Sequence, residues 1–178
     1  MDVTVGPASP EDMPFLHDML WEATAVDAGM RALGKDAALV LPSVRKYLDG
    51  WGRHGDAAVV ACAGYGERLG AAWYRLFPSD AGSYGFVAPD IPELSIGVTA
   101  AARGHGVGTA LLRALLTTAR AQGFAQMSLS VDRRNPARAL YERLGFHDAR
   151  VVAPEDTSIT LIAALSLSGT YHDPTGRA

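Results

Sequence analysis

Hydrophobic positions along the chain alternate with polar ones in some segments and recur every three or four residues in others. Alternation is typical of half-buried strands, and the longer period is typical of helices with one buried face. The pattern predicts strands at 3–5, 57–63, 71–77, 93–98, 126–131, 149–152 and 158–165, and helices at 10–23, 42–51, 109–121 and 135–144. No repeat or linker interrupts this order, so we expect one α/β domain whose single sheet carries helices on both faces.

Glycines and prolines predict the connections between these elements. Residues 64–70 contain three glycines and are typical of a hairpin, whereas 78–92 contain three prolines and two glycines and predict a long loop with a short strand at 84–87. Long ordered loops often carry function. Gly97 interrupts a predicted strand, which indicates either a bulge or the close approach of another backbone.

Composition then narrows the class of protein. The chain has 178 residues, of which 48% are hydrophobic and 20% charged, as in ordinary globular domains. We expect a domain over 1–168 and a flexible tail over 169–178. The sequence contains no run of about 18 apolar residues, and its acidic start lacks a signal-peptide pattern, so we expect no membrane partner. A formal net charge of −3 argues against nucleic acid as a partner.

The single cysteine, Cys62, excludes an internal disulfide and a cysteine-based zinc site. We therefore expect no metal and a reducing compartment, the cytoplasm. Cys62 lies in an apolar predicted strand, which favours a buried, inert thiol over a nucleophile.

Charge is distributed unevenly along the chain. Residues 1–100 hold 13 acidic and 7 basic side chains, while residues 101–150 hold 8 arginines and 3 acids. The basic segment would suit a compact anionic ligand such as a phosphate, because the arginine fork matches it well. A solvated surface or codon bias explains the same excess without any function.

A glycine-rich segment lies within the basic stretch, between a predicted strand and the 109–121 helix. Gly104, Gly106 and Gly108 let the backbone turn sharply and approach a ligand, and the first N–H groups of the helix are unpaired. Together they predict a nest for phosphate, with Arg103 adding a charge at its entrance. The alternative is a tight turn that only starts the helix.

The kind of phosphate ligand is not decided by this segment alone. A Walker loop would need a lysine after Gly108, and a dinucleotide fingerprint would need glycine where the chain has Thr109. Asp132 ends the next predicted strand and could bind a ribose hydroxyl, which keeps a nicotinamide cofactor open. That fingerprint normally follows the first strand of a parallel series, whereas two antiparallel-looking strands come first here.

A second segment, Asn135-Pro-Ala-Arg-Ala-Leu-Tyr141-Glu-Arg-Leu-Gly-Phe146, follows the strand after the long helix. With Val98-x4-Arg103-Gly-His-Gly-Val-Gly108, it resembles the GCN5-related N-acetyltransferase (GNAT) superfamily, tightly over 93–146 and loosely at the start. The resemblance implies a mixed, mainly antiparallel sheet of about six or seven strands. It also implies that the central strands 93–98 and 126–131 splay apart.

The resemblance further implies acetyl-coenzyme A as cofactor. Pantetheine would pair with the exposed backbone of the first splayed strand, as a substitute strand. The pyrophosphate would lie on the glycine segment, and the second motif would line the cofactor further along. The implied cofactor-binding residues are Ile96, Gly97, Val98, Arg103, Gly104, His105, Gly106, Val107, Gly108, Thr109, Asn135, Ala137, Arg138 and Tyr141.

The implied reaction transfers an acetyl group to a primary amine of a small molecule or peptide by direct attack. Tyr141 matches the family tyrosine that protonates the leaving thiolate, although packing and cofactor positioning would also explain it. Glu93 stands where several members carry a carboxylate base, acting directly or through water; the alternative is a solvated glutamate. Glu22 and Asp27 are weaker candidates for holding the amine, and His105 is more often a variable surface residue.

Two other functions remain to be separated from this one. A coenzyme A-binding sensor or interaction module would keep the fold without turnover. A nicotinamide-dependent oxidoreductase would leave 135–146 unexplained. The resemblance also allows a homodimer, since dimers are common in the family.

Overall fold

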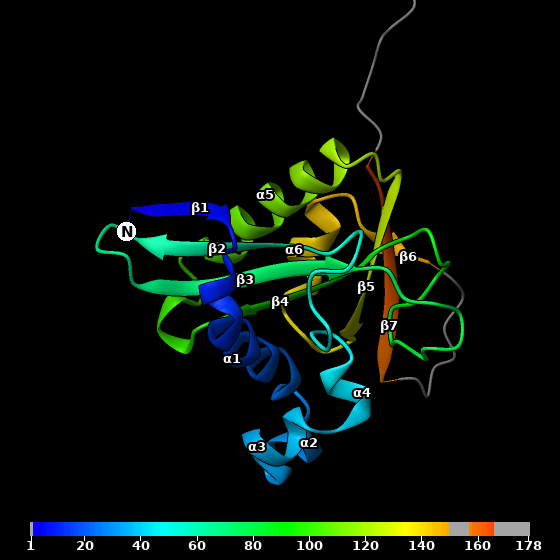
Figure 1. The fold of residues 1–178 in the computed structure, drawn as a ribbon, viewed down its shortest axis with the longest axis horizontal. Helices are drawn as coiled ribbons and strands as arrows, with labels where there is room; N and C mark the ends of the chain where they lie inside the picture. The colour runs from blue at the N-terminus through cyan, green and yellow to red at the C-terminus, as the bar shows by residue number, and fades with distance from the viewer. Residues whose placement is uncertain (1, 150–156, 166–178) are drawn as a thin grey trace, which may run out of the picture.

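The computed structural model describes residues 2–149 and 157–165. A single seven-stranded sheet crosses the molecule in the order β1-β2-β3-β4-β5-β7-β6 (Figure 1). Its strands are β1 (Val3–Pro7), β2 (Ala57–Ala63), β3 (Arg68–Arg75), β4 (Glu93–Val98), β5 (Gln126–Asp132), β6 (His147–Asp148) and β7 (Ser158–Ala164).

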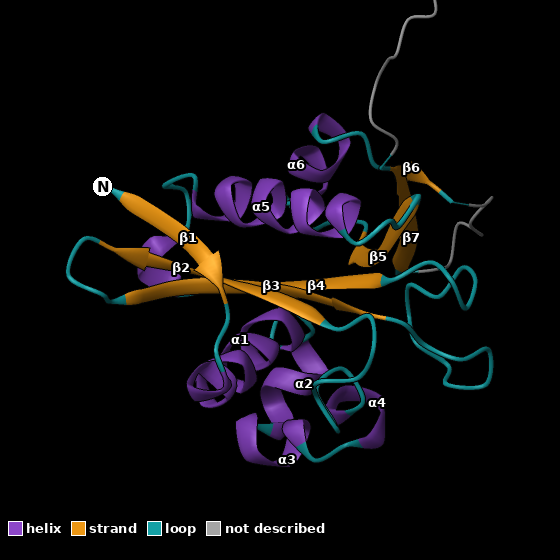
Figure 2. Ribbon diagram, turned by 45° about the horizontal axis from the view of Figure 1, so that its top comes forward, coloured by secondary structure: helices purple, strands orange, loops and turns teal. Residues whose placement is uncertain are grey.

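Helices cover both faces of this sheet, as predicted (Figure 2). The helices α1 to α4 lie on one face, and α5 and α6 lie on the other. The helical elements are η1 (Pro10–Asp12), α1 (Met13–Thr24), α2 (Ala28–Leu33), α3 (Lys35–Leu39), α4 (Pro42–Arg45), η2 (Ala100–Ala102), α5 (Val107–Ala121) and α6 (Arg138–Arg143).

Each face has its own hydrophobic core. On the α5 face, Leu111, Leu112 and Leu115 are fully buried against residues of β3, β5 and β7, as the leucine stripe of this helix predicts. On the α1 face, Leu16 and Leu20 pack with Trp73 of β3 and with Tyr47. Successive side chains of β3 point to opposite faces of the sheet and are buried in the two cores in turn. This strand therefore contributes to both hydrophobic cores.

Neighbouring strands pair antiparallel throughout the sheet except at β4 and β5. These two strands run parallel and share one bridge, between Glu93 and Ser128, which is flanked by a hydrogen bond from Ser128 N–H to Pro92 C=O (3.0 Å). Beyond this point β4 keeps its pairing with β3 as far as Val98, while β5 pairs with β7. The two central strands therefore diverge like the arms of a V, which confirms the predicted splay.

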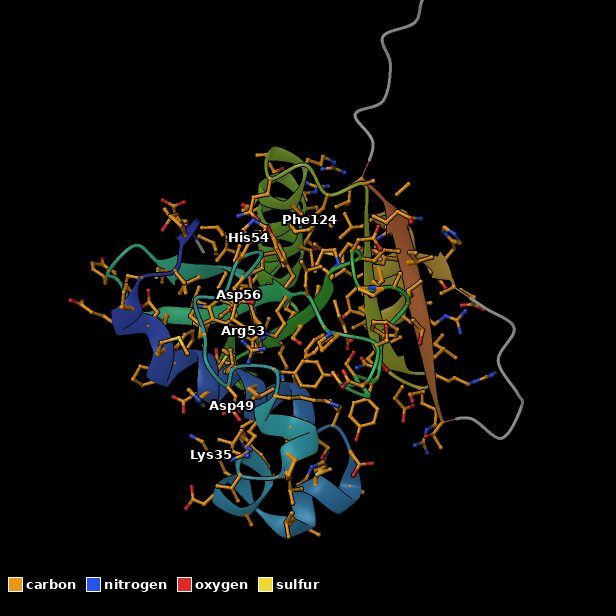
Figure 3. All side chains as sticks on the ribbon, turned by 45° about the vertical axis from the view of Figure 1, so that its right-hand side comes forward. Lys35, Asp49, Arg53, His54, Asp56 and Phe124 are labelled. Carbon is orange, nitrogen blue, oxygen red and sulfur yellow. The ribbon has the colours of Figure 1, made fainter. Side chains whose placement is uncertain are left out.

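A buried ion pair anchors the segment between α4 and β2 to the sheet. Arg75 of β3 binds Asp56 (2.6 Å), and the side chains of both residues are at most 3% exposed. Arg75 also donates to the carbonyls of Lys46 and Asp49, while Asp56 accepts from the backbone N–H of Arg53. Figure 3 labels Asp49, Arg53 and Asp56 along this segment. Because every charged oxygen and nitrogen is hydrogen-bonded, the pair can tolerate burial.

The first half of the chain departs most from the predicted elements. The strand expected at 84–87 is wrong: a turn occupies residues 84–85. The helix expected over 42–51 ends at Arg45 and continues as turns, and the two short helices α2 and α3 were not predicted. Both lie where exposed residues break the helical period, so hydrophobic patterning carries little signal there.

Smaller shifts occur at element ends. The returning strand of the hairpin covers 68–75 instead of 71–77, since the turn is tighter than its glycines suggest. The strand expected at 149–152 does not include residue 149: β6 covers only His147–Asp148, and residues 150–152 lie outside the described part. The tail predicted from residue 169 also lies outside it. Within the described residues, no helix is both long enough and apolar enough to cross a membrane.

Gly97 marks a close backbone approach and not a bulge, since the β3–β4 register is regular. A Cβ atom at this position would lie 2.3 Å from the carbonyl oxygen of Met19 and 2.8 Å from its Cβ. The absence of a side chain at Gly97 therefore allows α1 to pack directly on β4.

We expect Gly97→Ala to lower the free energy of unfolding by about 1–3 kcal/mol, because α1 must move away from the sheet. Gly6→Ala is the matched control: Gly6 also lies in a strand, but no atom lies within 4 Å of its added Cβ. The control should stay within about 0.5 kcal/mol of the wild type. Denaturant unfolding measures both, and equal effects would contradict the packing argument.

Candidate functional site

Glu93 lies at the vertex where β4 and β5 begin to diverge. Its side chain is on the α1 face of the sheet, and the residue is only 4% exposed. The oxygen Oε1 accepts hydrogen bonds from the hydroxyl of Tyr47 (3.0 Å) and from the backbone N–H of Gly85 (2.9 Å). Glu93 is thus not a solvated strand-start residue but a buried, oriented carboxylate.

The burial of Glu93 disfavours the ionised form of its carboxyl group. Burial raises the pKa of this carboxyl above its usual range, although the proximity of the Ser83 hydroxyl, the hydrogen bonds from Tyr47 and the Gly85 N–H, and the Lys46 ammonium partly offset the effect. Burial likewise lowers the pKa of Lys46, which donates to the carbonyl of Gly82 (2.6 Å). A raised pKa lies closer to neutral pH, and a general base is most effective when its pKa is near the pH at which the enzyme works.

Several buried polar atoms around Glu93 lack hydrogen-bond partners among the described residues. They include Oε2 of Glu93 and the hydroxyls of Ser83 and Ser128; the indole Nε1 of Trp73, on the same face of the sheet, also lacks a partner there. Ser128 is the bridge partner of Glu93, and Trp73 lies on the same face of the adjacent strand β3. Buried polar groups are nearly always satisfied in folded proteins. This cluster is therefore suited to receive a polar ligand or water at the vertex of the V.

The open arm of β4 offers backbone groups to the gap between the strands. Thr99 N–H donates to Leu69 C=O (2.9 Å), and hydrogen-bonded pairs alternate along an antiparallel ladder. That alternation directs the N–H and C=O of Gly97 towards β3 and those of Ile96 and Val98 towards the gap. In agreement, Val98 C=O accepts a hydrogen bond from the side chain of Arg103 (3.2 Å).

The amino end of α5 lies at the mouth of the same gap. Gly104 and Gly106 adopt positive φ angles of 77° and 83°, and no side chain caps the helix. The N–H groups of its first turn are thus available to an anion. A Cβ on Gly108 would lie 3.5 Å from Leu140 and 4.0 Å from Ile96 and Val98. The helix start, the open arm of β4 and the region of α6 therefore converge.

Tyr141 of α6 is 7% exposed and packs edge-on against Phe146, with ring centroids 6.0 Å apart. Burial raises its pKa to about 12, so its hydroxyl stays protonated at neutral pH. Tyr141 belongs to the core on the α5 face, whereas Glu93 faces α1. The two candidate catalytic residues thus approach the gap from opposite sides of the sheet.

Acidic partners restrain several of the arginines in the basic segment. Arg103 pairs with Glu22 of α1 (2.5 Å), and Arg138 pairs with Glu142 (2.8 Å) and Asp148 (3.3 Å). The segment is therefore less cationic than its composition suggests, and anion binding would rely mainly on backbone N–H groups.

The remaining candidates have local structural roles. His105 Nδ1 lies 2.8 Å from Arg103 C=O. Asn135 accepts from Ala137 N–H (2.9 Å) in the turn before α6, and Asp27 caps α2 through Met30 N–H (2.9 Å).

The sequence did not single out five residues around the Glu93 carboxylate: Lys46, Tyr47, Ser83, Gly85 and Ser128. Tyr47 falls on the apolar face of the helix expected over 42–51, and this pattern indicates that the side chain is buried but not that it contacts Glu93. Ser128 could have been found from the strand pairing, had the register of the parallel bridge been known. Gly85 lies in the long loop, which was expected to be functional without any residue being named.

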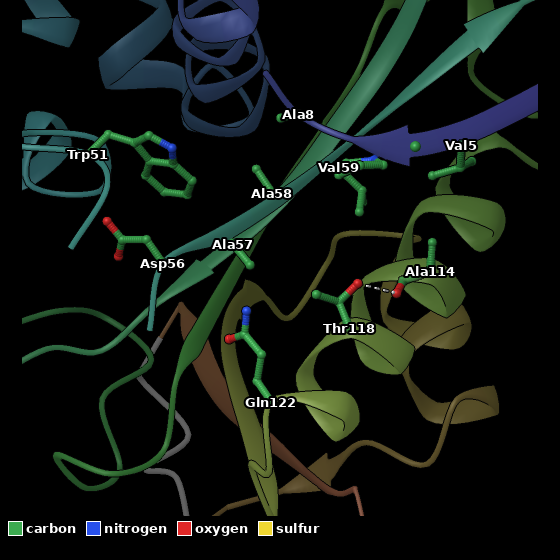
Figure 4. Close-up of a pocket in the computed structure, with 12 residues that line it drawn as sticks. Val5, Ala8, Trp51, Asp56, Ala57, Ala58, Val59, Ala114, Thr118 and Gln122 are labelled. Carbon is green, nitrogen blue, oxygen red and sulfur yellow. Dashed lines mark hydrogen bonds between the residues drawn. The ribbon is translucent and has the colours of Figure 1, made fainter. Parts of the chain in front are cut away.

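A surface pocket of about 490 Å³ lies elsewhere, between the β1–β2 edge and the carboxyl half of α5 (Figure 4). Its polar side chains are already engaged: Thr118 donates to Ala114 C=O, Gln122 accepts from Tyr74, and Asp56 binds Arg75. Val107, where α5 begins, is about 16 Å along the helix from Thr118. The pocket is thus separate from the V of β4 and β5.

Comparison with known proteins agrees with this geometry. The family model described as acetyltransferase (GNAT) family matches residues 16–146. The chain belongs to the GNAT family. Because the family consists of acetyltransferases and the curated relatives are named as such, the chain is an N-acetyltransferase. Family membership removes the basis for a nicotinamide enzyme, and Asp132 is instead hydrogen-bonded to Arg134.

Two curated relatives are L-methionine sulfoximine/L-methionine sulfone acetyltransferases, from Pseudomonas paraeruginosa and Pseudomonas aeruginosa. Each is 31% identical to this GNAT chain over 147 residues, covering 82% of the chain and 81% of the relative. The structure of a GCN5-related N-acetyltransferase from Kribbella flavida superposes with a TM-score of 0.64 at 22% identity, covering 91% of this chain and 97% of that one. The fold is therefore that of the family.

We expect Glu93→Gln to gain stability relative to the wild type as the pH rises from about 4 to 8. Because folding raises the pKa of Glu93, the wild type loses stability as the pH rises through the unfolded-state pKa towards the folded one. The variant cannot titrate, and its amide can donate to a serine hydroxyl where Oε2 has no partner.

Denaturant unfolding at several pH values measures this difference. Glu67→Gln, in the exposed β2–β3 turn, is the control and should show no such trend. A Glu93→Gln difference that does not change with pH would contradict the burial argument.

Proposed function

We propose that this enzyme transfers the acetyl group of acetyl-coenzyme A to a primary amine of a small molecule by direct attack. The observation that carries the proposal is the V between β4 and β5. A buried carboxylate lies at its vertex, and an uncapped helix start lies at its mouth.

The residues around the gap fit coenzyme A. The N–H groups that follow Gly106 would hold the pyrophosphate, and the gap-facing backbone of Ile96 and Val98 would pair with pantetheine. Gly108 leaves room beside Leu140 where a larger side chain would intrude. When bound, acetyl-coenzyme A supplies the activated acetyl group as a thioester.

Two side chains of the protein, Glu93 and Tyr141, would carry out the proton transfers. Glu93 would take the proton from the ammonium form of the acceptor, directly or through water, and leave a nucleophilic amine. The gap-directed N–H of Val98 would stabilise negative charge that develops on the acetyl oxygen. Tyr141, which stays protonated, would donate its proton or a hydrogen bond to the departing sulfur.

Direct attack is favoured over an acyl-enzyme on cysteine. Cys62 is half-buried on β2, and β3 separates this strand from β4. A thiol so placed is two strands away from the gap where the acetyl group would lie.

The acceptor class follows from the relatives and from the vertex. The Pseudomonas enzymes are named for L-methionine sulfoximine and L-methionine sulfone, which are small amino acids with a primary amine. The unpartnered Ser83, Ser128 and Trp73 groups offer hydrogen bonds to a polar acceptor of this kind. We therefore infer that a small amine, and in particular an α-amino acid with a polar side chain, is preferred over a peptide.

The test is a turnover assay with acetyl-coenzyme A and a panel of amines headed by methionine sulfone and methionine sulfoximine. Released thiol reports transfer, and mass spectrometry identifies the acetylated product. We expect turnover with at least one small amino acid. Coenzyme A binding without turnover on any amine would contradict the proposal and favour a sensor.

We expect Gly106→Asp to weaken coenzyme A binding about fivefold or more relative to Gly106→Asn, at low salt. Both side chains meet the same positive φ of 83° and open space, so only the negative charge differs. Calorimetric titration measures both affinities, and the difference should shrink as salt screens the charge. Equal affinities in the two folded variants would contradict the proposed nest.

We expect Tyr141→Phe to lower kcat about 10- to 100-fold while the dissociation constant of coenzyme A changes less than about threefold. The ring and its contact with Phe146 remain, and only the proton donor is lost. Steady-state kinetics and calorimetry measure the two quantities. A loss of affinity alone would make Tyr141 a residue that positions the cofactor.

A further inference from the structure

The hydroxyl of Tyr47 is held in a fixed orientation by two hydrogen bonds. It accepts from the backbone N–H of Tyr84 (3.1 Å), and it lies 3.0 Å from Glu93 Oε1. The N–H can only donate, so the hydroxyl hydrogen is directed at the carboxylate. The Tyr47 ring is 8% exposed and packs edge-on against Phe77 at 5.2 Å, which leaves it little freedom to turn away.

The loop that contains Gly85 clamps the same carboxylate oxygen. Gly85 N–H donates to Oε1, and a Cβ on Gly85 would lie 2.7 Å from the carbonyl carbon of Leu129 and 2.9 Å from Glu93 Cδ. The loop thus lies directly on β5 and on the carboxyl group. As a result, Oε1 has two donors while Oε2 has none among the described residues.

We propose that Tyr47 is a positioning residue for Glu93, fixing Oε1 as a hydrogen-bonded anchor so that Oε2 is the oxygen that accepts the amine proton. This inference rests on the proposed function, in which Glu93 is the base. In the step, an N–H bond of the ammonium breaks, an O–H bond forms at Oε2, and the nitrogen keeps the electron pair.

Other groups around the carboxylate support this division of roles. Ser128 is the bridge partner of Glu93, and its hydroxyl is buried and unpartnered, so it can receive a hydrogen bond from a protonated Oε2. The charged groups that face Glu93 are Lys46 from the segment after α4, and Arg75 opposite it on β3, which Asp56 neutralises. Neither donates a hydrogen bond to the Glu93 carboxylate, whereas Tyr47 does.

The first experiment compares Tyr47→Phe with the wild type across pH. The ring and its packing remain, but a donor that favours the charged carboxylate is lost. We expect the acidic limb of kcat/KM, and the titration of the Glu93 carboxyl followed by carbon NMR, to move to higher pH by about one unit.

A second variant keeps the test informative if Tyr47→Phe folds poorly. Replacing Tyr47 with 3-fluorotyrosine retains the hydroxyl and makes it a stronger donor, because fluorine withdraws electrons. We expect the limb and the carboxyl titration to move in the opposite direction, to lower pH. A purely structural role for Tyr47 would produce neither shift.

Tyr74→Phe is the matched control, since it removes a buried tyrosine hydrogen bond, to Gln122 (2.9 Å), on the other face of the sheet. It should leave the limb and the Glu93 titration in place. Loss of turnover in Glu93→Gln with unchanged titration in Tyr47→Phe would overturn the proposal alone. Full turnover in Glu93→Gln would overturn the base assignment and the proposal together.

Discussion

The single bridge between Glu93 and Ser128 is the constraint on which the site depends. Strand β4 is fully paired with β3 on one side but is joined to β5 at this point only. A second or third bridge would close the gap and satisfy the backbone of Ile96 and Val98 internally. The sheet instead leaves these groups without a strand partner in the gap, where the Arg103 side chain donates to Val98 C=O, while β7 pairs with β5 on its other side. The gap-facing backbone groups of β4, which do not pair with β5, are thus the groups that the proposed function assigns to cofactor binding.

The buried polar groups that lower the stability of the fold are concentrated at the vertex of the V. Glu93 is buried with a raised pKa, and the hydroxyls of Ser83 and Ser128 have no hydrogen-bond partner in the part of the chain that the structure describes. Such groups normally cost a folded protein stability, and functional sites are where that cost is retained. The buried Arg75–Asp56 pair has a different character, because its hydrogen bonds are satisfied and it holds the segment that carries Tyr47.

Much of the fold could be predicted because its signals are local. The leucine stripe predicts α5, Gly123 marks its end, and the motif over 135–146 places α6. The short helices α2 and α3 could not be predicted, because their exposed residues give no amphipathic period. Gly97 was ambiguous in the sequence, since its reason is the contact with Met19, a residue 78 positions away.

The candidate site was predicted unevenly for the same reason. The proposed cofactor residues lie within or directly beside two contiguous motifs, so a resemblance could find them together. These neighbours of Glu93 come from three separate segments, and only the folded chain brings Tyr47, Gly85 and Ser128 to one carboxylate. Arg103 shows what composition omits: its charge suggested a phosphate partner, and the structure adds an ion pair with Glu22 of α1 that no local pattern indicates.

The placement of Glu93 and Tyr141 on opposite faces also bears on chemical fidelity. A thioester is prone to attack by water, and an enzyme that holds one beside an exposed base would waste its donor. Here the sheet stands between the α5 side and the carboxylate, and Oε2 is closed to solvent. If Glu93 is the base, as proposed, a water molecule on the α5 side would find no base to activate it. The sheet would then reserve the base for an acceptor that enters from the α1 face.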